Sequence, residues 1–320
     1  MTSVDVAIPN YNYGRYLRAC VESVLAQDVE KLRVLIIDNA STDGSAEIAL
    51  DLAGSDPRVE ARIRPTNLGP HASFNEAIDW ASADFFLLLC SDDLLVPGAL
   101  RRATEILEAE PSLAFVYGRD LQVGEDDLRA EVEDTPVAGW RRIGGHAFIE
   151  RFCRLGVFQI PGPTIVVRTS AQKAAGYYRP ELPHSDDYDV WLRLAMQGDV
   201  AEMDTVQAMI RDHGQNRSSQ LRARQILHIR HTEMAVDCFF AHEGSRMPDA
   251  RELRRLARLG LGGRAYWSAV SSLLRREPGG LQLLKFAISR RPTTAVFPPL
   301  RYLLERPDVL GRAGSILHLR

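Results

Sequence analysis

Two kinds of hydrophobic periodicity alternate along the first part of the chain. Apolar or alternating patterns typical of strands stand at residues 4–9, 32–38, 58–65 and 85–89. Helical spacing of apolar residues stands between them, at residues 16–27, 45–53 and 72–81. This strand–helix–strand order predicts right-handed crossover connections and a mainly parallel sheet that helices cover on both faces.

The pattern changes twice further along the chain. Residues 120–145 are acidic and rich in turn formers, which predicts a solvated loop or a short hairpin. From about residue 220 onward, helical stretches separated by Gly and Pro replace the alternation. The sequence therefore predicts an α/β domain over residues 1–220 and a helical C-terminal region over residues 221–320.

Polar residues follow three of the predicted strands. The three motifs are Pro9-Asn10-Tyr11-Asn12, Asp38-Asn39 and Asp92-Asp93. Ligands of open α/β sheets bind beyond the carboxyl ends of the strands, so the motifs predict a common binding site. Asp92 and Asp93 place like charges side by side, and we expect an exposed pair that holds a divalent cation. A polar turn that caps a helix is the simpler alternative for this pair.

Composition places the chain among soluble globular proteins. Of its 320 residues, 45% are hydrophobic and 25% are charged. It has no run of about 18 apolar residues and no secretory pattern at its start. Its four cysteines lie far apart among apolar neighbours. These features predict a cytoplasmic protein whose cysteines are reduced core thiols.

The formal net charge of −3 conceals an asymmetry between the two predicted parts. Residues 221–320 hold 18 Lys and Arg against 8 Asp and Glu, whereas residues 1–220 hold 21 against 34. This asymmetry predicts either peripheral contact with an anionic membrane surface or packing against the acidic domain or a second subunit of a homodimer. Nucleic acid is not an expected partner.

Two common phosphate-binding motifs are absent from the sequence. There is no Gly-x-Gly-x-x-Gly after the first strand and no Gly-Lys-Ser/Thr. A nucleotide bound at this sheet would therefore need another counter-charge for its phosphates, and a divalent metal held by carboxylates supplies one.

Four motifs in order resemble the nucleotide-binding half of family 2 glycosyltransferases. They are VAIPNYNYGRYLRACVESVLAQ, VLIIDNASTDGS, RPTNLG and FFLLLCSDDLLVPGAL. Two later stretches, HSDDYDVWLRLAMQG and IRDHGQNRSS, also resemble family segments, so the resemblance covers about residues 3–219. Cys90 departs from the pattern, because it stands where the Asp-x-Asp-Asp form of the family has its first acid.

The resemblance implies a glycosyltransferase-A fold and a specific chemistry. It implies inverting transfer of a sugar from a UDP- or dTDP-type nucleotide sugar to an acceptor hydroxyl, with Mn²⁺ or Mg²⁺ as cofactor. The acceptor would be a carbohydrate, a lipid-linked molecule or a small molecule, in polysaccharide, cell-envelope glycan or glycoconjugate synthesis.

The resemblance also assigns roles to single residues. It implies that Asp93 and His213 hold the metal and that Asp187 is the catalytic base. Contacts with the nucleotide sugar are implied for Pro9, Asn10, Tyr11, Asn12, Asp38, Arg64, Asn67, Gly69, Asp92 and Asp93.

Other interpretations remain open at this point. The acids around Asp187 are also typical of a helix start, where carboxylates face the positive end of the helix dipole. A sugar nucleotidyltransferase would need a Gly-rich stretch near the N-terminus, which the sequence lacks. A non-catalytic sugar-nucleotide-binding scaffold is the third class, and the joint presence of Asp38, Asp93, Asp187 and His213 argues against it.

Overall fold

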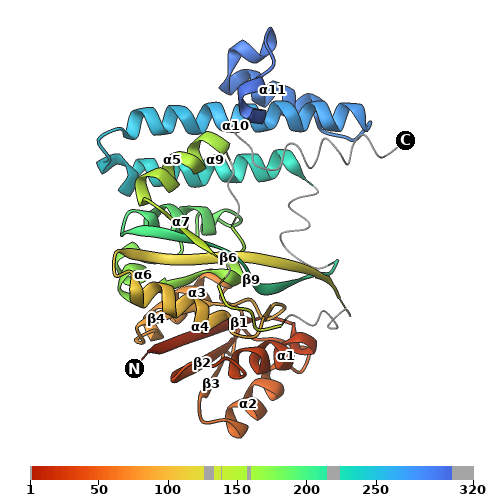
Figure 1. Cartoon of the computed structure of the whole chain (residues 1–320). Coiled ribbons are helices and arrows are strands. Elements are labelled where there is room, and N and C mark those ends of the chain that lie inside the picture. The colour runs from red at the N-terminus through yellow and green to blue at the C-terminus, as the bar shows by residue number, and fades with distance from the viewer. Residues whose placement is uncertain (1, 126–132, 138, 157–159, 215–223, 305–320) are drawn as a thin grey trace. The chain divides into compact units, whose positions relative to one another are not determined.

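The computed structural model describes residues 2–125, 133–137, 139–156, 160–214 and 224–304 (Figure 1). By their internal packing, these residues form two compact units. The first unit comprises Met1–Gly145, Ile160–Glu181 and Val190–Asn216, and the second comprises His146–Gln159, Leu182–Asp189 and Arg217–Arg320. The predicted boundary at residues 220 and 221 lies outside the described residues, and two segments from earlier in the chain pack with the C-terminal unit.

The first unit is built on one mixed sheet. Its strand order is β3-β2-β1-β4-β8-β6-β9-β5, with β7 paired to β9. The strands are β1 (Ser3–Asn10), β2 (Lys31–Asp38), β3 (Val59–Ile63), β4 (Phe85–Leu88), β5 (Leu94–Leu95), β6 (Leu113–Gly124), β7 (Trp140–Ile143), β8 (Val166–Arg168) and β9 (Asp199–Asp212). Strands β1 to β4 pair in parallel, as the strand–helix alternation of the sequence predicts.

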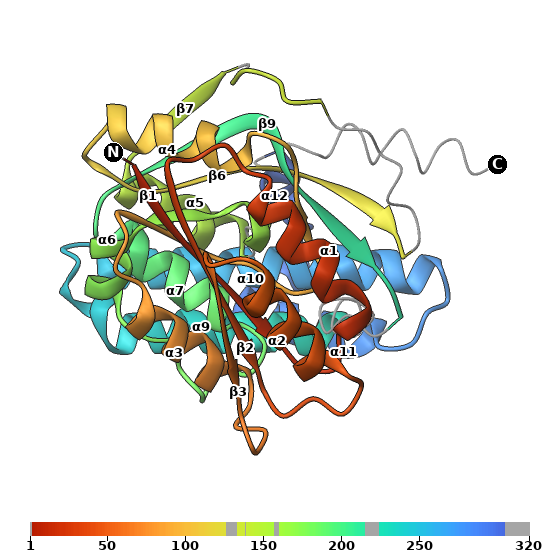
Figure 2. The same cartoon turned by 90° about the horizontal axis from the view of Figure 1, so that it is seen from below.

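Helices cover both faces of the parallel part. They are α1 (Gly14–Leu25), α2 (Ser45–Ser55), α3 (Pro70–Trp80), α4 (Ala99–Ala109) and the short α6 (Thr169–Ala175). Val34 and Ile36 of β2 join a core cluster with apolar side chains of α1, α2 and α4. Leu35 and Ile37 are equally buried but point to the opposite face. Figure 2 shows α1 and α2 on one side of strands β1–β3 and α3 on the other.

The second half of the sheet brings distant segments next to the parallel strands. β8 pairs antiparallel with both β4 and β6, and β9 pairs with β6 in parallel. The hairpin predicted within residues 120–145 is not formed by the described residues, because β6 continues to Gly124 and β7 pairs with β9. The short strand β5 follows Asp92 and Asp93 and pairs with the end of β9.

The second unit is helical. Its elements are α5 (Gly145–Leu155), the start of α7 (Asp186–Ala195), α9 (Gln225–Ala241), α10 (Ala250–Leu274), α11 (Gly280–Arg290) and α12 (Leu300–Leu304), with short 3-10 turns between them. Helix α10 passes close to the end of α5, since a Cβ at Gly260 would lie 2.4 Å from the carbonyl oxygen of Cys153. The helical C-terminal region is thus as predicted. Within the part of the chain that the structure describes, no helix combines the length and apolar character needed to cross a membrane.

Candidate functional site

The carboxyl ends of β1 and β2 meet at a buried pair of side chains. Asn10 and Asp38 are the last residues of these strands and lie opposite each other in the parallel register. Asn10 Nδ2 donates to Asp38 Oδ1 at 2.8 Å. Asn10 Oδ1 is buried and has no hydrogen-bond partner among the described residues, so it is an acceptor that a ligand could satisfy.

Asp38 organises the loop that follows β2. Its carboxylate accepts hydrogen bonds from Ser41 N at 3.0 Å and from Ser41 Oγ at 2.6 Å. Ser41 Oγ in turn accepts from Asn12 N at 2.9 Å. Asn12 has a positive φ of 58°, and its Oδ1 accepts from Thr42 N at 2.8 Å. The loops after β1 and β2 are therefore connected by hydrogen bonds. Asp38, which has no exposed surface, stabilises both loops through Ser41.

Asn39 connects this edge of the sheet to the turn before α3. Its Nδ2 donates to Asn67 Oδ1 at 2.7 Å and to the carbonyl of Gly69 at 3.2 Å. Its Oδ1 accepts from Arg64 Nη1 at 3.2 Å and from Leu68 N at 3.0 Å. The structure thus brings together the predicted residues Arg64, Asn67 and Gly69. The residue that joins them is Asn39, which belongs to the predicted Asp38-Asn39 motif but had no role of its own assigned from the sequence.

Arg64 is fixed from the other side by α3. Its guanidinium forms an ion pair with Glu76 and donates to Ser73 Oγ at 3.2 Å. Burial alone would raise the pKa of Glu76, but the ion pairs with Arg64 and Arg62 outweigh it and lower the pKa. Gly69 has a φ of +81°, a conformation that disfavours side chains, and it leads directly into Pro70 at the start of α3.

Asp92 and Asp93 follow β4 but are not exposed, contrary to expectation. Only 9% of the surface of Asp92 and 5% of the surface of Asp93 are accessible to solvent. Burial, together with the neighbouring charge of Asp92, raises the pKa of Asp93 well above its usual range. A buried carboxylate pair of this kind is favourable mainly when a cation or hydrogen-bond donors compensate it.

Cys90 is the second correction to the sequence interpretation. Cys20 and Cys153 are buried as predicted, but Cys90 is exposed and Cys238 is only half-buried, so these two are not core thiols. Its Sγ and one carboxylate oxygen each of Asp92 and Asp93 lie within 4.8 Å of one another. Among the described residues, this is the one group of three His, Cys, Asp or Glu side chains close enough to share a metal ion.

The end of β9 supplies further groups to the Asp92-Asp93 turn. Arg211 Nε donates to the carbonyl of Asp92 at 2.9 Å, and Arg211 N donates to Asp93 Oδ1 at 3.3 Å. His213 Nε2 lies 3.2 Å from Asp92 Oδ2. His213 was predicted as a metal ligand beside Asp93, and the structure places it next to Asp92. Because β5 pairs with β9, this proximity follows from the strand pairing.

Aromatic side chains at the start of α1 hold His213 in place. The Tyr16 ring stacks on the imidazole with centroids 5.2 Å apart, and Tyr13 packs against it edge-on at 5.3 Å. Burial and a hydrogen bond to Glu125 raise the pKa of Tyr16 to about 12, so this phenol remains neutral at physiological pH. Tyr11, by contrast, follows β1 directly and is 47% exposed.

Asp187, the predicted base, lies in the second unit. It is exposed in the first turn of α7, where Asp186 and Asp189 are buried. The helix start expected from the alternative interpretation is therefore present, with three acids in its first turn.

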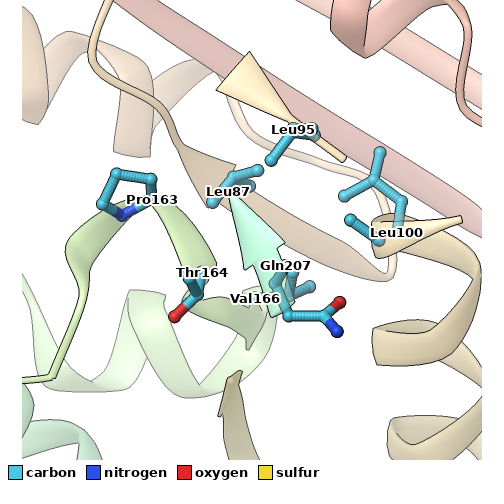
Figure 3. A pocket seen from close by; sticks show the side chains of 8 residues that line it. Leu87, Leu95, Leu100, Pro163, Thr164, Val166 and Gln207 are labelled. Carbon is cyan, nitrogen blue, oxygen red and sulfur yellow. The ribbon is translucent and has the colours of Figure 1, made fainter. Parts of the chain in front are cut away.

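A gap in the first unit lies away from these residues. It is lined by Leu87, Leu95, Leu100, Thr164 and Gln207 (Figure 3). It has no room for a water-sized sphere, so it is a packing gap of the core rather than a binding site.

A family model described as glycosyl transferase family 2 matches residues 5–174. The chain belongs to glycosyl transferase family 2. This agrees with the resemblance carried by its motifs.

Related sequences match mainly the N-terminal part. An uncharacterised glycosyltransferase of Nostoc is 31% identical over 123 residues, which are 38% of this chain and 38% of the relative. Chondroitin synthase of Pasteurella multocida is 35% identical over 123 residues, which are 38% of this chain and 13% of the relative. The matched part of the chain thus spans well under two thirds of these relatives.

Solved structures of glycosyltransferases share the fold over most of the chain. S. aureus TarS 1–349, in complex with UDP-GlcNAc, gives a TM-score of 0.57 at 16% identity and covers 92% of each chain. A mannosyltransferase of Pyrobaculum calidifontis, in complex with GDP-Man and Mn²⁺, gives 0.59 at 17% identity, with 99% of this chain and 80% of that chain covered. The family 2 chain therefore has the mixed α/β fold of these glycosyltransferases.

Proposed function

We propose that this protein transfers a sugar from a UDP- or dTDP-type nucleotide sugar to an acceptor hydroxyl, with inversion at the anomeric carbon. The observation that carries the proposal is the convergence of Asn10, Asp38 and Asp92-Asp93 at the carboxyl ends of β1, β2 and β4, joined by Arg211 and His213 from β9. The matched solved structures with UDP-GlcNAc and GDP-Man support a nucleotide-sugar donor.

The nucleoside would lie on the loops after β1 and β2. Pro9, Asn10, Tyr11 and Asn12 form one wall in this proposal, and the turn from Arg64 to Gly69 forms another. A pyrimidine ring can stack on the exposed Tyr11. The imide N–H of uracil or thymine could donate a hydrogen bond to Asn10 Oδ1, which accepts none from the described residues.

The Asp92-Asp93 turn fits a divalent cation. Two buried carboxylates and a thiol offer ligand atoms within 4.8 Å of one another. Ser91, which lies between Cys90 and Asp92 in the sequence, has a buried Oγ without a hydrogen-bond partner among the described residues. Asp93 would hold Mn²⁺ or Mg²⁺, with Asp92, Cys90 or His213 completing the protein ligands. When bound, the ion supplies positive charge that stabilises the departing diphosphate.

Asp187 is the proposed general base. The acceptor oxygen attacks the anomeric carbon as the bond to the diphosphate oxygen breaks, and that oxygen keeps the electron pair. The acceptor hydroxyl is a weak nucleophile, and its proton passes to the Asp187 carboxylate. Asp187 is exposed in the first turn of α7, as a group that receives a proton from an incoming acceptor must be.

The product and location of the reaction are the broader part of the proposal. Chondroitin and hyaluronan synthases among the relatives support a role in polysaccharide or cell-envelope glycan synthesis, with a carbohydrate or lipid-linked acceptor. The C-terminal helices would serve peripheral membrane contact or a homodimer. A non-catalytic scaffold would bind the donor but leave it intact.

A donor panel tests the proposal. Thermal shift is measured with UDP-, dTDP- and GDP-sugars with and without Mn²⁺, and donors that bind are then assayed for released nucleoside diphosphate. We expect a metal-dependent shift with UDP- or dTDP-sugars and slow diphosphate release. UMP, which lacks the second phosphate, is the control and should show little metal dependence. If donors bind but no combination of donor and acceptor releases nucleoside diphosphate, the non-catalytic scaffold is favoured.

A further inference from the structure

The segment that carries the proposed base is attached to the C-terminal unit. Residues Leu182–Asp189 pack with α5 and α9 rather than with the sheet-bearing unit. Tyr188, the residue after Asp187, has its hydroxyl 2.9 Å from His228 Nε2 of α9. Its ring packs edge-on against Phe152 of α5, with centroids 5.5 Å apart.

A second attachment lies on the other side of Asp187. Ser185 Oγ donates to the carbonyl of His231 at 2.6 Å. The rings of His184 and His231 pack edge-on at 4.9 Å. His228 and His231 are three residues apart on α9, so they lie on the same face of the helix, and this face contacts the segment.

We propose that His228 is a positioning residue for Asp187 and that α9 thereby sets the geometry of the proton transfer. This inference rests on the proposed function of Asp187. It assigns to the C-terminal helical unit a part in turnover, which its sequence does not indicate.

The residues on either side of Asp187 are buried and held by α9, whereas Asp187 itself is exposed. Tyr188 and His228 are 6% and 7% exposed, and a hydrogen bond between two groups this deeply buried is costly to lose. Asp187 itself is exposed and stands between the anchored residues Ser185 and Tyr188. Because Ser185 and Tyr188 are both held by α9, the backbone of Asp187 between them is held as well, while its side chain stays exposed. A displacement of about 1 Å at a reacting group can cost roughly 10²-fold in rate.

If His228 positions the base, its loss should lower turnover and leave donor affinity unchanged. If His228 is merely structural, its loss should lower both. His228→Ala removes the hydrogen bond between His228 and the Tyr188 hydroxyl and should lower kcat roughly 10-fold or more by misplacing the base. Donor affinity should stay within twofold, since the residues proposed to bind the donor belong to the other unit. His228→Gln can still hydrogen bond the phenol and should recover most of the rate. Met234→Ala, an exposed position on the same helix, is the matched control.

A double-variant cycle is the deciding experiment. If His228 acts through Asp187, then His228→Ala should have no further effect on kcat in an Asp187→Asn background. Equal losses from His228→Ala in both backgrounds, or a parallel loss of donor affinity, would overturn the inference.

A second readout does not depend on finding a substrate. Amide hydrogen exchange over residues 182–189 should speed up in His228→Ala and remain slow in Met234→Ala, with exchange in β1 and β2 unchanged. Unchanged exchange over residues 182–189 would show that α9 does not hold this segment. Faster exchange in a protein that turns over no donor would support the anchoring and contradict the proposed function alone.

Discussion

At the scale of single residues, the site is defined by which polar groups the fold leaves buried together. Asp38 is buried, and its hydrogen bonds to Asn10 and Ser41 show how the chain accommodates a carboxylate in its interior. Asp93 is also buried, but its neighbour is another carboxylate, and its pKa is raised accordingly. The first carboxylate supports loops, whereas the second is suited to a cation.

Ser41→Ala tests the supporting role of Asp38. The substitution removes the three hydrogen bonds of Ser41 Oγ, which donates to Asp38 Oδ1 and accepts from Asn12 N and Asn10 Nδ2. It leaves a buried carboxylate short of a donor, which should cost about 1–3 kcal/mol in the free energy of unfolding. Because Ser41 N remains a donor, the loss should stay at the lower end. Urea unfolding measures it, with exposed Thr42→Ala as control. An unchanged midpoint would show that the loops do not depend on this network.

Cys90→Asp tests the ligand set of the proposed metal site. A thiol ligand favours softer ions, whereas an all-oxygen set suits Mg²⁺ and Mn²⁺. We expect the aspartate variant to gain more UDP affinity from Mg²⁺ than the wild type does, and Cys90→Ser to fall between the two. Titration calorimetry with each ion measures the gain. Identical metal dependence in all three proteins would place Cys90 outside the coordination shell.

At the scale of elements, the sequence predicted the part of the fold that local patterns encode. Strands β1 to β4 with their intervening helices follow directly from apolar periodicity, and the polar residues at their ends could be read as a site. The roles of β9 and β7 could not be read in this way, because they depend on pairing between residues far apart in the sequence, such as Ile143 with Val200 and Leu94 with Met209. For the same reason, Arg211 could not be predicted, whereas the family resemblance did point to His213, whose Nε2 lies 3.2 Å from Asp92 Oδ2.

Asn39 shows another limit of reading motifs. It was quoted with Asp38, yet its side chain connects two loops that only the parallel pairing of β2 and β3 brings together. Likewise, the apolar neighbours of Cys90 suggested burial, whereas the turn after β4 exposes it. Local sequence context cannot distinguish the last buried residue of a strand from the first exposed residue of a turn.

The connection between Arg64 and α3 makes stability depend on pH. The pKa of Glu76 is lower in the folded protein than in the unfolded chain. Its contribution to stability is therefore present above the unfolded value of about 4.3 and is lost as the pH falls through the folded pKa. Glu76→Gln should cost up to about 1 kcal/mol at pH 7, and this difference should shrink below pH 4. Urea unfolding across this range measures it, and a constant difference would contradict the assigned ion pair.

At the scale of the whole molecule, the two units divide the proposed work. The sheet-bearing unit holds the residues for the nucleotide and metal, and the helical unit holds the segment with the base. Part of the positive charge of the helical unit is used internally, as in the ion pairs of Arg254 with Asp237 and of Arg290 with Glu233. Apolar side chains such as Leu274 and Phe297 are exposed there, at 80% and 71%.

Flotation with anionic vesicles separates the two predictions for the helical unit. Exposed apolar side chains among arginines should give binding that weakens between low and moderate salt, because the electrostatic part is screened. Neutral vesicles are the control. If the protein does not float at low salt and sediments as a dimer, the exposed side chains serve contact between two copies.

The proposed mechanism claims that donor binding and proton removal belong to different residues, and one paired measurement separates these two roles. Donor affinity with and without Mn²⁺, and turnover, are measured for Asp93→Asn, Asp187→Asn and the control Asp186→Asn. Asp93→Asn should lose the gain in affinity that the metal provides. Asp187→Asn should keep donor affinity and lose about 10²–10⁴ in turnover, and Asp186→Asn should lose much less. If Asp187→Asn turns over within threefold of the wild type, or if it loses donor binding together with Asp186→Asn, the claim is wrong.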